Sequence, residues 1–308
     1  MLMRMFVQIE RGSGDDLDGH VLASRPRRVR ARPCAMAVGG LDPGGGAGVL
    51  ADIRAFERAG AFGCAAVAVS TIQSVSGLRS VRVEPARHLV AQITEVLEHQ
   101  HVGAIKIGAL GSVENVRALS RELRRHRNIA IVVDTPILPT RGRARLIEPR
   151  ALPDVVDRLL PLATLVTVNV DEAYTLLGRR VRSSGDARDA ACALASGGAR
   201  AVLVKGGHLR GPLATDILAV DGDVVELHAP RLTGATVHGT GCTFASLVAG
   251  RLACGAGGVP DHNGLLAAVR WAKRVHHAAL AQAVQVGHGM RVMTFRPHAG
   301  LTVSRGAK

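Results

Sequence analysis

The stretch CAMAVGGLDPGGGAGVLADIRAFERAG, residues 34–60, contains the unit from which the fold of this chain can be predicted. Its first part, residues 34–40, is an apolar run typical of a buried strand. Residues 47–60 have the spacing of an amphipathic helix, which ends at Gly60. The glycine-rich segment 39–48 connects the two, so the stretch predicts a strand followed by a helix.

The same alternation continues along the chain. Strands are predicted at 64–73, 103–110, 128–135, 162–170 and 199–207, and helices at 87–99, 112–126, 171–178 and 187–198, with two more helices from about residues 242 and 262. A loop separates the strand at 128–135 from the one at 162–170. Asp-Gly at 221–222 predicts a hairpin over 214–229. This pattern predicts an α/β fold with a mostly parallel central sheet, helices on both faces, and ligands beyond the carboxyl ends of the strands.

Composition limits the classes of protein that this chain can belong to. Of its 308 residues 47% are hydrophobic but only 2% aromatic, so we expect an aliphatic core. The net charge of +14 comes from 35 Arg against 4 Lys, with five arginines in residues 25–32 alone. Because no nucleic-acid-binding motif accompanies them, we expect residues 1–32 to be a mobile Arg-rich extension without a nucleic-acid partner. The single domain would then span residues 33–308.

The cysteines and the apolar runs indicate a compartment. Five cysteines are scattered without CxxC spacing, which argues against a zinc site or a disulfide framework and for reduced thiols in the cytoplasm. No apolar run reaches the roughly 18 residues that a membrane span needs, so no membrane partner is expected. A secretory signal is not expected either, since no long apolar core precedes a cleavage site.

The glycine-rich segment GGLDPGGGAG, residues 39–48, is the first candidate site. Glycines let the backbone approach a ligand, and the helix start offers unpaired N–H groups. The segment lacks the ending of a Walker A loop, and Val49 stands where a dinucleotide-binding fingerprint has its last glycine. A tight turn without a ligand is the alternative. Asp52 can point back over the loop, and Gln73, at the next strand end, can donate to and accept from a heteroaromatic ring.

Two of the four lysines, Lys106 and Lys205, stand at predicted strand ends, each shortly before a glycine. In a chain so biased to Arg, a retained Lys indicates a role that Arg does not fill. A compact ammonium can contact phosphate as a point charge, so a phosphate contact is such a role. The alternative is a strand-end side chain that merely reaches water. Asn169 and Glu172 lie three residues apart at a strand-to-helix junction. Such a pair can hold Mg²⁺, directly or through water, or can be a plain helix cap.

The segment HGTGC, residues 238–242, precedes another predicted helix. Its consecutive backbone N–H groups would bind an anion at the helix N-terminus. The helix dipole is expected to lower the pKa of the Cys242 thiol. A buried, unreactive cysteine is the alternative, since a nucleophilic one needs a nearby histidine and His238 is adjacent only in sequence. Three further histidines lack metal spacing and are expected at the surface: His276, His277 and His288.

Taken together, residues from about 33 to 288 resemble the hydroxymethylpyrimidine and phosphomethylpyrimidine kinases of thiamine biosynthesis, in the ribokinase-like superfamily. The resemblance rests on GGLDPGGGAGVLADIRAFERAGAFG, STIQSV, IKIGALGS, VVDTPIL, VNVDEAYTLLG, VLVKGGHL and HGTGCTFA, in the family's order and spacing. It covers over four-fifths of the chain. It implies a three-layer α/β/α fold and a kinase that uses ATP and Mg²⁺ on a small pyrimidine substrate. Because members of this family often form dimers, a homodimer is also expected.

The resemblance also implies three groups of site residues. The anion hole consists of Gly239, Thr240 and Gly241, and Cys242 occupies the catalytic position where sugar-kinase relatives carry an aspartate. Positions similar to those that line the pyrimidine site are Gly40, Asp52, Gln73, Ala109 and Pro136. The nucleotide side consists of Asn169, Glu172 and Lys205, with Glu172 and Asp134 assigned to Mg²⁺.

Some positions depart from the family pattern. Ala109 stands where a methionine commonly packs against the pyrimidine, Pro136 where a valine is usual, and Val168 where a proline is usual. Residues 138–145 replace a Lys-Ser-Gly segment, and a basic residue there such as Arg141 could help to accept a phosphorylated substrate. The changes at 109 and 136 reshape the substrate pocket, whereas the anion hole is intact. The alternatives are therefore a pyridoxine or pyridoxal kinase, a non-catalytic pyrimidine sensor, or an Arg-rich nucleic-acid binder.

Overall fold

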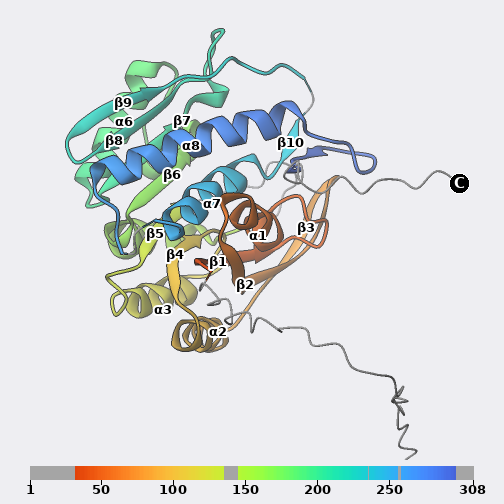
Figure 1. Cartoon of the computed structure of the whole chain (residues 1–308), viewed down its shortest axis with the longest axis vertical. Coiled ribbons are helices and arrows are strands. Elements are labelled where there is room, and N and C mark those ends of the chain that lie inside the picture. The colour runs from red at the N-terminus through yellow and green to blue at the C-terminus, as the bar shows by residue number, and fades with distance from the viewer. Residues whose placement is uncertain (1–31, 135–144, 235, 256–257, 296–308) are drawn as a thin grey trace, which may run out of the picture. The chain divides into compact units, whose positions relative to one another are not determined.

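The computed structural model describes residues 32–134, 145–234, 236–255 and 258–295 (Figure 1). The expected Arg-rich extension and its mobility lie outside the described residues, apart from Arg32, whose guanidinium pairs with Glu57 at 2.6 Å. Pro136 and Arg141 also lie outside them. No described helix combines the length and the apolar composition that a bilayer crossing requires.

Within the described residues, a nine-stranded sheet forms the centre of the fold (Figure 1). In spatial order its strands are β3 (Gly77–Val83), β2 (Phe62–Ser74), β1 (Cys34–Leu41), β4 (Val102–Ile107), β5 (Ala130–Asp134), β6 (Leu165–Asn169), β7 (Ala201–Lys205), β8 (Asp216–Val220) and β9 (Asp223–Leu227). The strands from β2 to β7 are parallel, and β3, β8 and β9 are antiparallel to their neighbours. The predicted mostly parallel sheet is confirmed.

Helices cover both faces of this sheet, as the apolar strands require. One face packs against α1 (Gly48–Ala59), α7 (Thr240–Ala253) and α8 (His262–Ala281). The other packs against α2 (Ala86–His99), α3 (Val113–Leu123), α5 (Val170–Leu177) and α6 (Ser184–Ser196). Side chains of strand β1 alternate between the two faces. Met36 and Val38 pack in the core on the α2 side of the sheet, and Ala35 and Ala37 pack in the core on the α1 side. The predicted three-layer α/β/α architecture is confirmed.

Two segments differ from the sequence-based expectation. Strand β3 is not predicted because it lies at the sheet edge and four of its seven residues are exposed. The predicted loop after β5 contains the helical turns η1 (Pro149–Ala151), α4 (Leu152–Asp154), η2 (Val155–Leu159) and η3 (Leu160–Leu162). Prolines at 149, 153 and 161 break the periodicity that a long helix would show.

The Asp-Gly hairpin is confirmed. Asp221 and Gly222 join β8 to β9 with positive φ angles of 50° and 89°, which is the conformation that a two-residue hairpin turn requires. A second, two-stranded sheet pairs β10 (Val237–His238) with β11 (Arg291–Val292), and these strands are too short for a sequence pattern to reveal.

Helices α1 and α7 approach each other closely through a glycine. A Cβ added to Gly250 of α7 would lie 2.8 Å from Ala59 Cβ and 3.1 Å from Phe56 Cα, both on α1. On its other side α7 packs against α8, where the Cζ atom of Arg251 lies 5.5 Å from the ring centroid of Trp271, a cation–π contact. Helix α7 is therefore held between two helices along its length.

We expect Gly250→Ala to lower the free energy of unfolding by about 1–3 kcal/mol, because the new methyl group overpacks the α1–α7 contact. Gly185→Ala is the matched control, since Gly185 is exposed in α6 and its Cβ would meet only Ser183 Oγ at 3.6 Å. There alanine should stabilise by up to about 1 kcal/mol through helix propensity. Urea denaturation followed by circular dichroism measures both, and effects of the same sign would contradict the prediction.

Candidate active site

The carboxyl ends of the parallel strands meet the first turn of α7. Asn169 and Lys205 end β6 and β7, and Asp134 ends β5. Gly239 is the N-cap of α7, with a φ of 74° that favours glycine, and no side chain caps this helix among the described residues. A Cβ added to Gly241 would lie 3.1 Å from Lys205 Nζ and 3.7 Å from Asp134 Oδ2. An ammonium therefore stands beside backbone N–H groups at a helix N-terminus, an arrangement that attracts anions.

Lys205 is held in place by Asp134. Its Nζ lies 3.0 Å from Asp134 Oδ1, which also accepts a hydrogen bond from the Thr167 hydroxyl at 2.9 Å. Burial alone would raise the pKa of Asp134, but Lys205, Lys106 and these hydrogen bonds hold it below the usual value. The carboxylate therefore stays charged and fixes the ammonium at the sheet edge.

Lys106 and Asp52 form a second ion pair that is completely buried. Lys106 Nζ lies 3.1 Å from both carboxylate oxygens of Asp52, and the Ser246 hydroxyl on α7 donates to Asp52 Oδ1 at 2.7 Å. Burial opposes the charge on Lys106, but Asp52 and other nearby anions raise the pKa of Lys106 above its usual value. Asp52, predicted at the substrate site, thus anchors a lysine, and its contact with substrate stays a prediction.

Asn169 and Glu172 form a reciprocal helix cap at the start of α5. Asn169 Oδ1 accepts from the backbone N–H groups of Asp171 and Glu172, at 2.9 and 2.8 Å, and Glu172 Oε2 accepts from the Asn169 N–H at 2.8 Å. Burial raises the pKa of Glu172 to about 7. The negative charge of Asp134 acts in the same direction, and the positive charge of Lys205 acts in the opposite direction. The structure thus shows the cap, and a role toward nucleotide or metal stays a prediction.

Cys242 lies in the first turn of α7, and its thiol differs from the expectation. Burial raises the pKa of Cys242 to about 11, although Lys106 and the N–H of Gly48 act in the opposite direction. The prediction of a lowered pKa is therefore wrong. The helix dipole is present, but Asp52 and Asp134 lie close enough to disfavour a thiolate as well. The side chain is a neutral thiol near pH 7.

His238 pairs with the glycine-rich segment and not with Cys242. Its Nε2 lies 2.9 Å from Asp42 Oδ2 and 3.0 Å from the side-chain amide of Gln73. Asp42 also accepts hydrogen bonds from the backbone N–H groups of Gly44 and Ala47, both at 2.9 Å. Sequence reasoning missed Asp42, although an aspartate followed by Pro43 and three consecutive glycines is the signal that could have found it.

The glycine-rich segment and the turn before α7 touch through their backbones. A Cβ on Gly239 would collide with the carbonyl oxygen of Gly46, and a Cβ on Gly46 would collide with the His238 ring. A Cβ on Gly48 would collide with the carbonyl oxygen of Gly40. These glycines are required by close approach, so the tight-turn alternative alone does not explain them.

Two of the predicted pyrimidine positions are neighbours. A Cβ on Gly40 would lie 3.6 Å from Ala109 Cβ. Ala109 also borders a cavity of about 20 Å³ that is lined mainly by apolar side chains, Val133 and Ile147 among them, together with Asp134. The small side chain at position 109 leaves room at this edge of the sheet.

His276 contributes to the site although sequence reasoning placed it at the surface. It lies on α8, and its Nε2 donates to the carbonyl oxygen of Thr240 at 3.0 Å. Its ring packs edge-on against Phe244, with ring centroids 5.6 Å apart. Burial lowers the pKa of His276 to about 4, so the neutral ring holds the first turn of α7 through the Thr240 carbonyl. The expectation of a surface residue is wrong because one face of α8 packs on α7.

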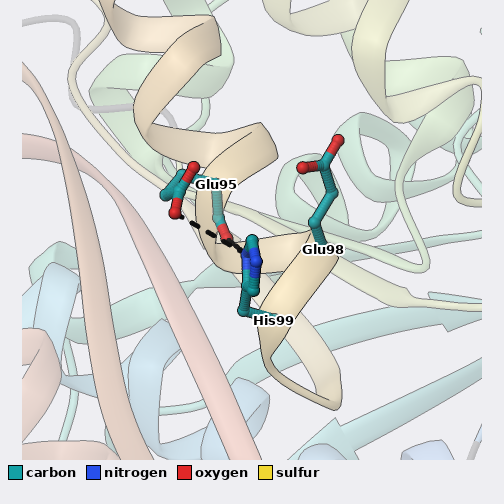
Figure 2. Close-up of side chains that lie close together, drawn as sticks. All are labelled: Glu95, Glu98 and His99. Carbon is teal, nitrogen blue, oxygen red and sulfur yellow. Dashed lines mark hydrogen bonds and ion pairs between the residues drawn. The ribbon is translucent and has the colours of Figure 1, made fainter.

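A separate cluster lies at the end of α2, away from the strand ends. Figure 2 shows Glu95, Glu98 and His99, whose side chains are exposed and within 4.8 Å of one another. His99 Nδ1 donates to the backbone carbonyl of Glu95 at 2.9 Å, and this bond together with the Glu95 carboxylate raises the pKa of His99. A histidine near the C-terminus of a helix commonly makes such a contact with a backbone carbonyl. The proximity of these three side chains therefore needs no bound metal ion to account for it.

The mostly parallel sheet and the lysine-flanked turn at its carboxyl edge define a kinase of the ribokinase-like class. The chain belongs to the phosphomethylpyrimidine kinase family, whose pattern it matches over residues 42–294. It is 39% identical over 261 residues to the hydroxymethylpyrimidine/phosphomethylpyrimidine kinase of Rhizobium meliloti (strain 1021), a match that covers 83% of this chain and 94% of that protein. The family expected from the sequence motifs is thus confirmed.

Solved structures of two kinds resemble the chain. The ADP complex of Bacillus subtilis pyridoxal kinase matches with a TM-score of 0.77 and 25% identity, over 85% of this chain and 97% of that one. A phosphomethylpyrimidine kinase from Clostridium difficile 630 matches with a TM-score of 0.67 and 27% identity, over 80% of this chain and 98% of that one. The expected ribokinase-like fold is therefore confirmed.

We expect Lys106→Met to lower the free energy of unfolding by about 3–5 kcal/mol, because it leaves the Asp52 charge buried and unpaired. The double variant Lys106→Met/Asp52→Leu should recover most of that loss. Arg188→Ala is the control, since its pair with Glu226 at 2.8 Å is exposed and should cost at most about 1 kcal/mol. Chemical denaturation measures all three, and a loss below the control's for Lys106→Met would refute the argument.

We also expect the alkylation rate of Cys242 to keep rising from about pH 7 to about pH 10, because only the thiolate reacts and the pKa of Cys242 is about 11. Iodoacetamide labelling followed by peptide mass spectrometry measures this rate. Cys192, an exposed free thiol on α6, is the accessibility control. An alkylation rate at Cys242 that levels off near neutral pH would show instead that the pKa of Cys242 is lowered.

Proposed function

We propose that this chain transfers the γ-phosphoryl group of ATP to the hydroxymethyl group of 4-amino-5-hydroxymethyl-2-methylpyrimidine, and then phosphorylates the monophosphate, in thiamine biosynthesis. The observation that carries the proposal is the position of Lys205 Nζ beside Gly241, at the uncapped start of α7. Membership of the phosphomethylpyrimidine kinase family supports the choice of substrate.

Phosphoryl transfer needs charge stabilisation more than covalent chemistry by the protein. In this proposal the backbone N–H groups of residues 239–242 and the ammonium of Lys205 gather the charge of the transferring group. Cys242, a neutral thiol at pH 7, holds the substrate hydroxyl in line by hydrogen bonding through its sulfur. The hydroxyl proton passes to an oxygen of the transferred phosphoryl group late in the transfer, as the new O–P bond forms and the bond to ADP breaks. Because the transition state is loose, removing the thiol should cost less than removing the charge-stabilising groups.

The nucleotide side needs a divalent cation, and the residues there fit one. Glu172 and Asp134 are two buried carboxylates, close enough for Asp134 to raise the pKa of Glu172. When both are ionised, their combined negative charge exceeds the single positive charge of Lys205. Oxygen donors of this kind are the ligands that Mg²⁺ prefers. We assign Glu172 and Asp134 to Mg²⁺, which would supply positive charge to neutralise the phosphates when bound, and Asn169 to the nucleotide side.

The pyrimidine would lie over Gly40 and Ala109, within reach of Gln73 and Asp52. Pro136 is assigned to the same pocket and lies outside the described residues. Pyridoxal phosphorylation is the second candidate activity, because the pyridoxal kinase of Bacillus subtilis has a similar fold. The small Ala109 side chain would leave space beside the ring for the different substituents of pyridoxal. A non-catalytic pyrimidine sensor is disfavoured, since the turn at 239–242 retains its lysine and both carboxylates.

The remaining parts of the proposal concern the whole chain. We propose that residues 33–308 form one kinase domain behind an Arg-rich extension. We further propose that the enzyme acts in the cytoplasm as a homodimer without nucleic-acid or membrane partners.

Cys242→Ala should lower kcat for the pyrimidine roughly a hundredfold, as expected when the reacting hydroxyl is no longer held in line, while KM changes little. Lys205→Met should lower kcat further, by roughly a thousandfold, because it removes charge stabilisation. An ADP-release assay with Mg-ATP and a panel of pyrimidine and pyridine alcohols measures both. Cys192→Ala is the control and should match the wild type. Unchanged turnover in Cys242→Ala would remove the thiol from the mechanism, and no activity on any panel member would overturn the proposed function.

A further inference from the structure

The side chains of Asp42, His238 and Gln73 form a hydrogen-bonded chain that the phosphoryl-transfer step does not use. His238 and Asp42 are almost fully buried, with 4% and 2% of their surfaces exposed. Burial alone would raise the pKa of Asp42, but His238 and the N–H groups of Gly44 and Ala47 hold it below its usual value. Asp42 is therefore an ionised acceptor, so the proton between it and His238 sits on His238 Nε2.

The other end of the chain is fixed by a hydroxyl. Thr71 Oγ1 lies 2.8 Å from the carbonyl oxygen of Leu41, which can only accept, so Thr71 spends its single proton there. Gln73 Oε1 lies 3.3 Å from Thr71 Oγ1 and Gln73 Nε2 lies 3.0 Å from His238 Nε2, and turning the amide by 180° about its last bond exchanges these two ends. The amide is thus placed between an oxygen that can only accept and a nitrogen that can only donate.

These proton positions select one orientation of the Gln73 amide. The oxygen and nitrogen ends of a glutamine amide have nearly the same shape, so their partners decide which end faces which. The NH₂ end must face Thr71 and the carbonyl end must face His238, since the reverse would set two donors and two acceptors against each other. Each end keeps unused capacity, one N–H and one carbonyl lone pair, for a ligand.

We propose that His238 and Asp42 are positioning residues that lock the Gln73 amide, so that it offers a donor and an acceptor in a fixed order to the edge of the substrate ring. This proposal rests on the proposed function. An aminopyrimidine presents an amino donor beside a ring-nitrogen acceptor, which complements a locked amide. A pyridine with a ring hydroxyl presents a different order, so the lock favours the aminopyrimidine.

The test compares kcat/KM of the full chain for the aminopyrimidine alcohol and for pyridoxal, as a ratio. His238→Leu removes the donor and should lower the pyrimidine-to-pyridoxal ratio at least about fivefold, the effect of one hydrogen bond. His238→Gln can place an amide N–H near the Nε2 position and should restore much of it. The ratio does not respond to misfolding, because a lower active fraction reduces both activities equally.

A double-mutant cycle shows whether His238 acts through Gln73. Gln73→Ala should lower the same ratio, and adding His238→Leu to it should change the ratio no further. A His238→Leu variant that loses both activities by one factor, or effects that multiply in the double variant, would overturn the proposal. If the wild type phosphorylates neither alcohol, the proposed function fails, and the amide lock is then decided by a measurement that needs no turnover.

That measurement is neutron diffraction on the deuterated full chain. We expect deuterons on His238 Nε2 and on the end of the Gln73 amide that faces Thr71. Deuterons on the amide end that faces His238 would overturn the lock whatever the enzyme phosphorylates.

Discussion

The site depends on the direct contact between two glycine-bearing backbones. The segment around Gly46 and the turn at Gly239 approach so closely that a single Cβ on either would collide with the other side. Asp42 holds this contact by accepting from the loop N–H groups and from His238, which immediately precedes the turn. The loop at the end of β1 and the helix α7 thus take up their positions together, although about 190 residues separate them.

Charge is distributed along the carboxyl edge of the sheet in alternating signs. Lys106 pairs with Asp52 at the β1–β4 side, and Lys205 pairs with Asp134 across β5 and β7. Each ammonium is thereby kept charged in a place where burial would otherwise neutralise it. Burial, reinforced by the neighbouring carboxylates, explains why Cys242 keeps its proton and why the pKa of Glu172 is raised to about 7. The acidic groups thus hold both ammonium groups in place at this edge of the sheet.

The sequence allows the strands, most helices and the Asp-Gly hairpin to be predicted, because buried parallel strands read as apolar runs. It does not reveal β3, whose residues are largely exposed, or the proline-broken turns from Pro149 to Leu162. The motif positions at 239–242 can be predicted, but the pKa of Cys242 cannot, since burial depends on packing from distant segments. Nor can spacing show that Lys205 meets Asp134, 71 residues earlier, or that His276 supports Thr240 from another helix.

The near absence of aromatic residues has a practical consequence. The chain contains a single tryptophan, Trp271, and its ring lies against Arg251 at the α7–α8 contact. Intrinsic tryptophan fluorescence therefore comes from one location, on α8. This helix packs against α7, whose first turn lies at the carboxyl ends of the strands. The tryptophan fluorescence of the unlabelled protein therefore reports on the packing of α7 against α8 and is not an average over several sites.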